Sequence, residues 1–450
     1  MNKQEISQHE IVENISALLA DGQTDASRVL LNSLHPAEIA HTLEALPHDK
    51  RESAWHLINP EYSGDVLTYV NHEVRGGLIA NTATDVLFAA TESLAADELA
   101  DILPDLPERV INRLLLAMDQ QDRHRLESIL KYPDDTAGGL MSTDTITIRP
   151  DVTLDVVLRY LRFSSALPDT TDKLFVVNRE DKLLGVLSLN RLVTNDPDLT
   201  VAEVFNTDVD YLYAETEEHE IAHLFEKRDL ISAPVVDADK KLLGRITIDD
   251  IVDVIRDEAD HSLMSLAGLD EEDDIFSPVV RSTRRRSVWL GINLLTALLA
   301  SWVISQFSAT IEHMVALAVL MPIVASMGGI AGSQTLTLVI RGLAVGQVGK
   351  SNAMKLLHKE MMIGALNGGV WAIVIGALAF FWFDNLQLGA IIAMAILFNL
   401  VVASIAGATI PMLLQKYGAD PALGGGVVLT TITDVVGFFA FLGLAAVFLM

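Results

Sequence analysis

The stretch VVLTTITDVVGFFAFLGLAAVFLM, residues 427–450, decides the fold class of this chain. It is almost entirely apolar and, at about 1.5 Å per helical residue, long enough to cross roughly 30 Å of hydrocarbon. Its single ionisable side chain is Asp434. A carboxylate at the centre of a membrane helix costs roughly 2.5–3.5 kcal/mol to insert, so such a residue faces a partner or a water-filled cavity. The stretch therefore predicts a membrane span that carries a functional acid.

Other apolar stretches extend this reading to five predicted spans. They are Val288–Phe307, Met314–Ala344, Met361–Phe383, Leu388–Leu414 and Val427–Met450. All nine Lys and Arg residues from position 281 onward fall before the first span or around the second and fourth connections. The remaining two connections carry only Glu312 and Asp384, and positive residues mark the cytoplasmic side of a membrane. We therefore expect a bacterial inner or plasma membrane protein with its N-terminal region in the cytoplasm and its C-terminus outside.

The region ahead of the spans is strongly acidic. The chain of 450 residues has a net charge of −28, and its first 280 residues carry 23 basic and 55 acidic side chains. Such a surface repels nucleic acid and anionic lipid and attracts cations. The sequence has no cysteine, which excludes disulfides and thiolate metal sites. The polar start MNKQEISQHEIVENISALL predicts no signal peptide.

Polar and small residues inside the spans predict a polar path through the helix bundle. The second span contains MPIVASMGGIAGSQTLTL, and Asn399 and Pro411 interrupt the fourth. Helix–helix packing would explain each of these residues singly. An interhelical ion pair would explain Asp434, but no basic residue lies in the interior of any span. We therefore expect Asp434 to be an ion site, and the pore-lining candidates are Gly328, Gly329 and Asn399.

Two segments ahead of the spans repeat at a constant offset of 59 residues. The repeated segments are KLFVV (173–177) with KLLGVLSLNRLV (182–193), and SAPVV (232–236) with KLLGRITIDDIV (241–252). Each copy reads as a strand, a turn, a second strand and a helix, preceded by an amphipathic helix. The pair resembles tandem CBS modules, which sense small ligands. The second copy has the Thr-x-x-Asp pattern, Thr247 and Asp250, that contacts nucleotides in many such modules, whereas Arg191 replaces the acid in the first copy.

Helical sequence with a second repeat precedes this pair. LHPAEIAHTLEALP (34–47) and LAADELADILPDLP (94–107) share one apolar pattern at an offset of 60, which favours short helices stacked in a superhelix. The predicted fold is a multidomain membrane protein with an all-α N-domain, an α+β CBS pair, a connecting helix and a five-helix all-α transmembrane domain. The predicted boundaries are 1–136 for the N-domain, 137–200 and 201–258 for the two CBS modules, 249–280 for the connecting helix and linker, and 281–450 for the transmembrane domain.

The connecting helix, DDIVDVIRDEADHSLMSLAGL from Asp249, carries acids at a helical spacing. Asp250, Asp253, Asp257 and Asp260 share an arc of about 80°. A solvated face would explain them, although like charges at such spacing destabilise a helix. The alternative is that neighbouring surfaces are also acidic and that bound cations complete the contact. Mg²⁺ suits this role because it keeps several waters and needs only one or two carboxylates.

In this order the parts resemble the MgtE family of magnesium channels and transporters, over nearly the whole chain. The matching motifs are DELAD (97–101), AGGLM (137–141), TIDDIVDV (247–254), MGGIAGSQTLTLVIRGLA (327–344), DPAL (420–423) and TDVVGF (433–438). The resemblance implies a homodimer with a pore between its protomers, where Asp434 recruits hydrated Mg²⁺ for import. It also implies that the connecting helix is a plug, which closes the pore when cytosolic Mg²⁺ binds between the acidic domains.

The resemblance also assigns particular acids to the sensing of cytosolic Mg²⁺. The sensing candidates are Asp65, Asp97, Asp101, Asp229, Asp250, Asp253, Asp257 and Glu258, with Asp420 near the cytoplasmic mouth of the pore. ATP, a regulatory ligand in the family, would bind the CBS pair at Thr247 and Asp250. His219 and His261 stand where acids are expected, which implies that one or two sensing ions are weaker or missing.

Rival functions follow from other features of the sequence. AVGQVGKS (344–351) fits a relaxed phosphate-loop pattern, but it follows a membrane span rather than a strand, so we do not expect an enzyme. A CBS-regulated transporter of Co²⁺ or Na⁺ is an alternative, because Asp434 would serve those ions too. The absence of cationic residues from the interior of the spans disfavours anions. A membrane-anchored sensor that transports nothing would tolerate the loss of Asp434.

Overall fold

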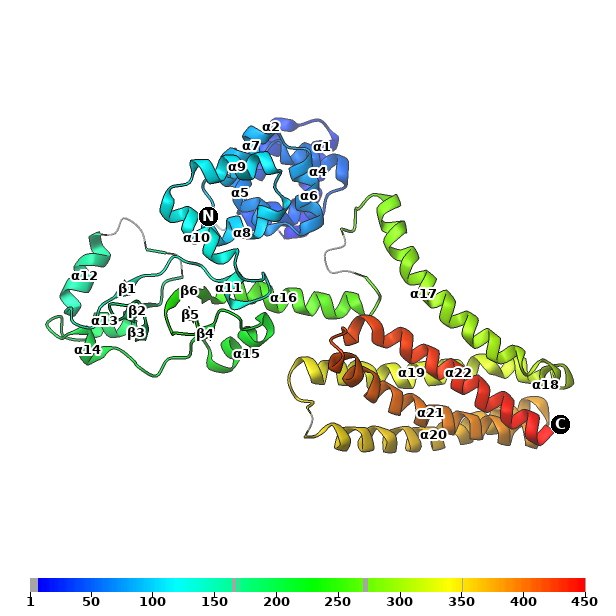
Figure 1. Cartoon of the computed structure of the whole chain (residues 1–450). Coiled ribbons are helices and arrows are strands. Elements are labelled where there is room, and N and C mark those ends of the chain that lie inside the picture. The colour runs from blue at the N-terminus through cyan, green and yellow to red at the C-terminus, as the bar shows by residue number, and fades with distance from the viewer. Residues whose placement is uncertain (1–6, 164–166, 169, 270–273, 350, 450) are drawn as a thin grey trace. The chain divides into compact units, whose positions relative to one another are not determined.

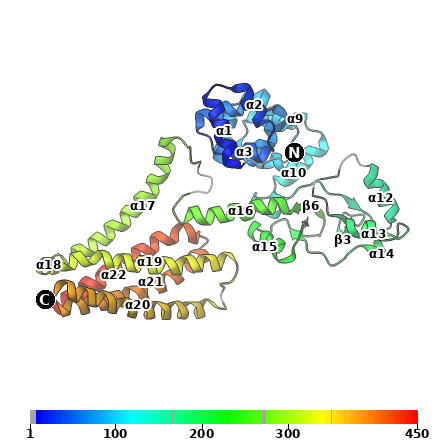
Figure 2. The same cartoon turned by 180° about the vertical axis from the view of Figure 1, so that it is seen from behind.

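The computed structural model describes residues 7–163, 167–168, 170–269, 274–349 and 351–449 (Figure 1, and from behind in Figure 2). The chain forms two compact units, which are described separately below. The first unit comprises residues 1–259 and 272–277, and the second comprises residues 260–271 and 278–450.

The N-domain of the first unit is a stack of short helices. They are α1 (Gln8–Ala20), α2 (Thr24–Leu31), α3 (Pro36–Glu44), α4 (His48–Trp55), α5 (Pro60–Tyr69), α6 (His72–Ala80), α7 (Thr84–Thr91), α8 (Ala96–Ile102), the 3₁₀ turn η1 (Leu103–Asp105), α9 (Glu108–Ala117) and α10 (Gln120–Ile129). Polar caps start several of them, because the side chains of Ser7, Asn71 and Asp119 accept hydrogen bonds from first-turn amides. These caps stabilise the first turns of α1, α6 and α10.

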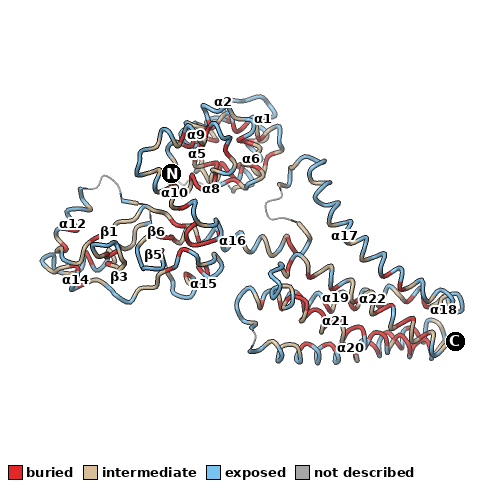
Figure 3. Tube along the Cα trace, viewed as in Figure 1, coloured by how far each residue is buried: buried red, intermediate tan, exposed pale blue. Residues whose placement is uncertain are grey.

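The repeated apolar positions of the N-domain form its core. Ile39 and Leu46 in the first copy of the repeat, and Leu99 and Leu106 in the second, are all buried. Figure 3 shows the buried residues of this domain on the inner faces of its helices. The structure thus confirms the predicted helical N-domain.

Two three-stranded sheets with flanking helices form the CBS pair. The elements are α11 (Ala137–Leu140), β1 (Thr147–Ile148), α12 (Leu154–Phe163), β2 (Lys173–Val177), β3 (Leu183–Ser188), α13 (Leu189–Thr194), α14 (Val201–Val204), β4 (Leu212–Tyr213), α15 (Glu218–Arg228), β5 (Ser232–Val236) and β6 (Leu242–Thr247). In each sheet the first strand runs parallel to the second, and the second runs antiparallel to the third. Reciprocal backbone bonds join the modules: the Leu183 amide donates to the Lys240 carbonyl, and the Leu242 amide donates to the Asp181 carbonyl.

The helix α16 (Ile248–Ser265) follows β6 directly and extends from the first unit into the second. It is the predicted connecting helix. Ile251 and Val254 are buried, whereas Val252 and Ile255 are exposed. The helix therefore packs onto the first unit by a narrow apolar edge.

The second unit contains the five predicted membrane helices. They are α17 (Val279–Ser305), α19 (Ala316–Ala344), α20 (Ala353–Phe383), α21 (Leu386–Lys416) and α22 (Pro421–Leu449), and the short α18 (Ser308–His313) connects the first two. Most of them begin several residues before the predicted span, for example at Ala353 rather than Met361. The reason is that the helices continue through polar residues at the membrane surface, whereas the predicted spans contain only the apolar part of each helix.

Helix α21 lies at the centre of the membrane unit and packs against α19, α20 and α22, which lie side by side with it (Figures 1 and 2). Small residues permit this packing. A Cβ atom on Gly376 of α20 would lie 2.9 Å from the Gly389 carbonyl oxygen of α21, and one on Gly389 would lie 2.7 Å from that of Gly376. The two backbones therefore touch where these helices cross.

Candidate cation sites

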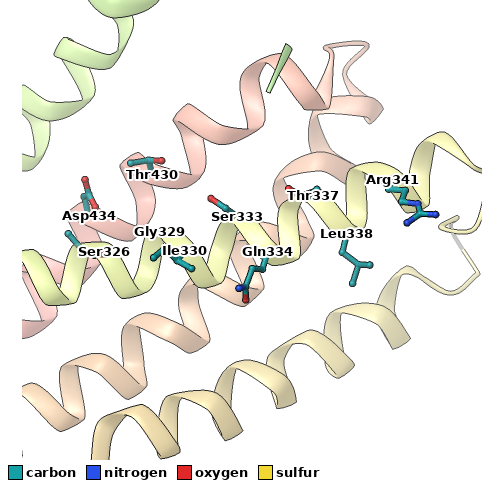
Figure 4. Close-up of a pocket in the computed structure, with 11 residues that line it drawn as sticks. Ser326, Gly329, Ile330, Ser333, Gln334, Thr337, Leu338, Arg341, Thr430 and Asp434 are labelled. Carbon is teal, nitrogen blue, oxygen red and sulfur yellow. The ribbon is translucent and has the colours of Figure 1, made fainter. Parts of the chain in front are cut away.

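A groove between α19 and α22 contains Asp434, the acid on which the sequence argument depends (Figure 4). Its volume is about 910 Å³. The lining residues are Ala325, Ser326, Gly329, Ile330, Ser333, Gln334, Thr337, Leu338 and Arg341 from α19, and Thr430 and Asp434 from α22. Since liquid water occupies about 30 Å³ per molecule, the groove has room for an ion together with its first shell of waters.

Asp434 is half-buried and lies thirteen residues into α22, roughly 20 Å along the helix from its start. None of the ion pairs in the described part of the chain involves it. On the facing helix the groove offers the hydroxyl and amide groups of Ser326, Ser333 and Gln334. The carboxylate is thus available to a cation in a groove to which both helices contribute polar side chains.

The three pore-lining candidates lie in different places. Gly329 lines the groove. Gly328 and Asn399 instead lie where α19, α21 and α22 meet: Asn399 is fully buried, and its side-chain amide donates to the Val324 carbonyl at 3.0 Å. A Cβ atom on Gly328 would lie 2.3 Å from the Asn399 Nδ2 atom, and one on Gly437 would lie 2.7 Å from it. Asn399 therefore contacts both helices that form the groove.

Several of the predicted sensing acids come together in the first unit, where the N-domain meets α16. Burial, with repulsion from Asp97, Asp134 and Asp250, raises the pKa of Asp101 to about 7, even though the nearby Arg75 opposes the change. Burial also raises the pKa of Asp250 to about 6, and the charges of Asp249 and Asp97 add to it. Burial is thus the main cause of both shifts, and neighbouring carboxylates add to it.

Asp97 extends this acidic cluster toward the first CBS module. Burial raises its pKa, the Ser142 side chain opposes the change by hydrogen bonding, and the Asp144 charge adds to it. Burial likewise raises the pKa of Glu98, with repulsion from Asp97 and Asp65. The cluster therefore joins α5, α8, the start of the first CBS module and α16.

Asp253 lies on the same side of α16. Burial raises its pKa, Arg256 opposes the change, and Asp257 and Asp249 add to it. The Tyr69 hydroxyl lies near the same acids: burial raises its pKa, and the charges of Glu98 and Asp253 add to the change. The negative potential of the cluster thus spreads from α16 to the end of α5.

A second group of acids surrounds Glu218 at the start of α15. Burial raises the pKa of Glu218, and Asp135, Glu258 and Asp257 add to it, while His219 opposes the change. His219, which stands in an expected acid position, lies 3.4 Å from Glu217. Asp229 is exposed at the other end of α15, in a left-handed conformation with φ of 50°.

In the second unit, Asp420 and His261 are partners. The His261 Nε2 atom lies 3.4 Å from Asp420 Oδ2, between the last turns of α16 and the start of α22. Asp420 also caps α22, since its two carboxylate oxygens accept hydrogen bonds from the Ala422 and Leu423 amides. A histidine thus occupies this position beside Asp420, where the resemblance led us to expect an acid.

The acids fit a divalent cation by charge, although they do not form a compact ligand set. Among the described residues, no group of three or more His, Asp or Glu side chains lies close enough together to hold an ion. The sequence did not predict four further acids: Glu98, Asp144 and Asp249 in the first group and Glu218 in the second. The general acidity of the region was visible, but nothing in the spacing marked these four residues.

The candidate nucleotide residues contact one another. The backbone amide and hydroxyl of Thr247 both donate to Asp250 Oδ2, at 3.1 and 3.0 Å. This arrangement fixes the Asp250 side chain at the first turn of α16. Arg191, at the corresponding place in the first module, donates instead to the Val204 carbonyl.

Comparison with known proteins gives matches along the whole chain. The family described as divalent cation transporter MgtE matches residues 321–444, the MgtE intracellular N domain matches 34–135, and the CBS domain matches 137–197 and 201–257. The magnesium transporter MgtE of Thermus thermophilus is 30% identical over 448 residues, which cover 98% of this chain and 99% of that protein. The magnesium transporter MgtE of Bacillus subtilis is 27% identical, with 99% of each chain covered. A crystal structure of the cytosolic domain of the Mg²⁺ channel MgtE in complex with ATP is 30% identical, has a TM-score of 0.49, and covers 54% of this chain and 99% of that chain.

Proposed function

This chain belongs to the MgtE family of magnesium transporters, and we propose that it is a channel that imports hydrated Mg²⁺ past Asp434. Family membership confirms the expectation of a membrane transporter with CBS domains, and of a protein that is not an enzyme. The observation that carries the finer proposal is the place of Asp434. It is an acid without an ion-pair partner among the described residues, in a groove within the membrane unit that several polar side chains line.

The chemistry of Mg²⁺ suits a single carboxylate. Mg²⁺ gives up its waters reluctantly and is often held by one or two carboxylates while it keeps the rest of its shell. The hydroxyl groups of Ser326, Ser333 and Thr430 can accept hydrogen bonds from those waters. One acid also attracts the ion without holding it so tightly that it cannot leave, which conduction requires.

The polar side chains that line the groove are exposed on the single chain, which favours a second copy of the chain as the surface that covers them. Ser326, Ser333, Gln334, Thr337 and Thr430 are exposed on the single chain, although they lie within membrane helices. Polar groups in contact with lipid are costly, and in membrane proteins they normally face protein or water. A homodimer that joins two such grooves would enclose one pore.

The acidic cluster supports closure of this pore by cytosolic Mg²⁺. When Mg²⁺ is scarce, repulsion among Asp97, Asp101 and Asp250 favours separation of the N-domain from α16. When Mg²⁺ is abundant, the ion neutralises these carboxylates and stabilises the compact arrangement, in which α16 acts as a plug. A ligand shifts such an equilibrium only by its preference for one state, so the compact state has to supply the better site.

Replacement of Asp434 by Asn tests the conduction path. We expect D434N to abolish Mg²⁺ uptake, both in a strain that lacks other Mg²⁺ routes and in vesicles that contain the purified protein. The matched control is D384N, which neutralises an acid at the end of α20 outside the groove and should leave uptake intact. Normal uptake by D434N would refute the proposal and favour a membrane-anchored sensor.

Neutralisation of Asp250 and Asp253 tests the sensing site. We expect D250N/D253N to keep the pore open at high Mg²⁺ and to weaken the protection from protease that Mg²⁺ gives the cytosolic region. The control is D198N, an exposed acid in the first CBS module. Unchanged protection in D250N/D253N would disprove the assignment.

Transport of Co²⁺ or Na⁺ is the alternative, because Asp434 alone does not choose among cations. Uptake of each ion into the same vesicles, with and without D434N, separates the two functions. ATP is proposed as a regulatory ligand at Thr247 and Asp250, and T247A should weaken ATP binding without affecting uptake in the absence of ATP. Single cysteines introduced into this cysteine-free chain would test the proposed orientation, with the N-terminus inside.

A further inference from the structure

Four residues just before the first membrane helix are held by the N-domain. We call Asp274, Ile275, Phe276 and Ser277 the strap; they belong to the same compact unit as the N-domain. Ser277 is followed by Pro278, the residue that precedes α17. The strap is therefore the part of the chain that joins the first unit to the first membrane helix.

A buried ion pair anchors the strap to α4. The Arg51 guanidinium donates to both carboxylate oxygens of Asp274, with Nη1–Oδ2 and Nη2–Oδ1 distances of 2.6 and 2.9 Å. The two side chains are only 5% and 6% exposed, so water screens this pair poorly. The Arg51 Nε and Nη2 groups also donate to the Leu43 and Glu44 carbonyls, which fix the guanidinium in place.

A second anchor comes from Glu73 on α6. Its carboxylate accepts hydrogen bonds from the Asp274 amide at 3.1 Å and from the Ser277 hydroxyl at 2.5 Å. Asp274 Oδ1 also accepts a bond from the Phe276 amide, which folds the strap into a turn. Each end of the strap is thus bound to the N-domain by a charged hydrogen bond.

Polar contacts rather than apolar packing hold the strap. Ile275 at its centre is 91% exposed and Phe276 is 39% exposed, so only one of its two apolar side chains is largely covered. Instead, the charged side chains of Arg51 and Glu73 hold the strap through hydrogen bonds. Hydrogen bonds weaken steeply with distance and angle, so a small movement of the strap would break these contacts.

We propose that the strap couples the N-domain directly to α17. Movement of α4 and α6 on Mg²⁺ binding would then reach the first membrane helix through four residues, in parallel with the route through α16. The regulatory part of this inference rests on the proposed function, because it assumes that the N-domain moves when it senses Mg²⁺. The contact itself does not depend on which ion is transported.

Thiol crosslinking of the full-length protein tests the contact. Because the chain has no cysteine, the pair E73C/S277C is the only one present, and we expect a short bifunctional thiol reagent to join it. Adding D274A should lower the yield at least about fivefold, since it removes the buried ion pair. D274N, which keeps the shape of the side chain, should lower the yield less, and D85A is the control because Asp85 forms an exposed pair with Arg113.

Transport assays test the coupling. We expect D274A to raise the Mg²⁺ concentration that half-closes the pore by at least about threefold, while the maximal uptake at low Mg²⁺ and the response of D85A stay unchanged. Equal crosslinking with and without Asp274 would overturn the strap, whichever ion the protein carries. A lost crosslink with unchanged Mg²⁺ closure would overturn the coupling, and failure of D434N to affect uptake would count against the proposed function alone.

Discussion

Asn399 should determine how closely the two walls of the Asp434 groove approach each other. Its fully buried side chain contacts Gly328 on α19 and Gly437 on α22, and Gly437 lies one helical turn from Asp434. We predict that G437A impairs both folding and Mg²⁺ uptake, and that N399A partly restores both. The prediction follows from the sizes of the two side chains.

The magnitudes can be estimated from the distances. A Cβ atom at Gly437 would lie 2.7 Å from Asn399 Nδ2, so the buried Asn399 side chain or one of the helices has to move, at a cost of about 1–3 kcal/mol. Removal of the Asn399 side chain loses its bond to the Val324 carbonyl, worth about 0.6 kcal/mol for a hydrogen bond between membrane helices. It also opens space for the new methyl group. The double variant should therefore be more stable than the sum of the single effects by roughly 1–2 kcal/mol.

Thermal unfolding in detergent and uptake into vesicles measure these effects. At about 2–4 °C per kcal/mol, the coupling corresponds to a shift in Tm of several degrees. G426A is the matched control on the same helix, because a Cβ atom there meets nothing within 4 Å. Additive effects of N399A and G437A on Tm, or normal uptake by G437A, would show that this junction does not set the groove.

Further predictions concern the first unit and the start of α17. Because the pKa values of Asp101 and Asp250 are raised to about 7 and about 6 from 3.8, the compact state binds more protons than the separated state, and its stability rises as the pH falls from about 7 toward 4. Without Mg²⁺, protection of the cytosolic region from protease should thus be greater at pH 5.5 than at pH 8, and D101N/D250N should reduce this difference. Greater protection at pH 8 would contradict the reasoning. Separately, G268A should destabilise the membrane unit and alter Trp289 fluorescence, because Gly268 has a φ of 71° and a Cβ atom there would lie 2.1 Å from the Trp289 indole nitrogen. G346A, with a φ of 64° and open space around it, controls for backbone strain, and an equal effect of the two substitutions would exclude the contact as the cause.

The architecture was largely predictable because each part has a strong periodic signal. The apolar runs predicted the five membrane helices. The 59-residue offset predicted two similar modules, and their sheets repeat at that offset, with Lys173 opposite Ser188 and Ser232 opposite Thr247. The short edge strands β1 and β4 were not predicted, since two residues are too few to show alternation. The reach of α22 back to Pro421 was also missed, because the glycines at its start do not look helical.

The site was less predictable, because it depends on contacts between distant parts of the chain. Asp434 stood out as a lone acid in an apolar run, and Gly329 lines the same groove. The role of Asn399 depends on which helices cross beside it, which its own segment does not encode. The strap was invisible for the same reason: Arg51 and Asp274 are more than two hundred residues apart, and neither lies in a recognisable motif.

The proposed function explains the unequal distribution of acids between the two units. Within the membrane each carboxylate costs roughly 2.5–3.5 kcal/mol, so one acid is what a conducting path can support while its ion stays mobile. A sensor instead needs several acids. To shift a two-state equilibrium from 1:99 to 99:1, the ligand has to prefer one state by about 5.5 kcal/mol. In the proposed mechanism several crowded carboxylates supply this preference together, because their mutual repulsion penalises the compact state until cations bind. Burial is the main cause of the raised pKa values of Asp97, Asp101 and Asp250, and the charges of neighbouring carboxylates add to it. Adding a second acid near Asp434 should therefore trap the ion, whereas removing one acid from the cluster should only make the gate less steep.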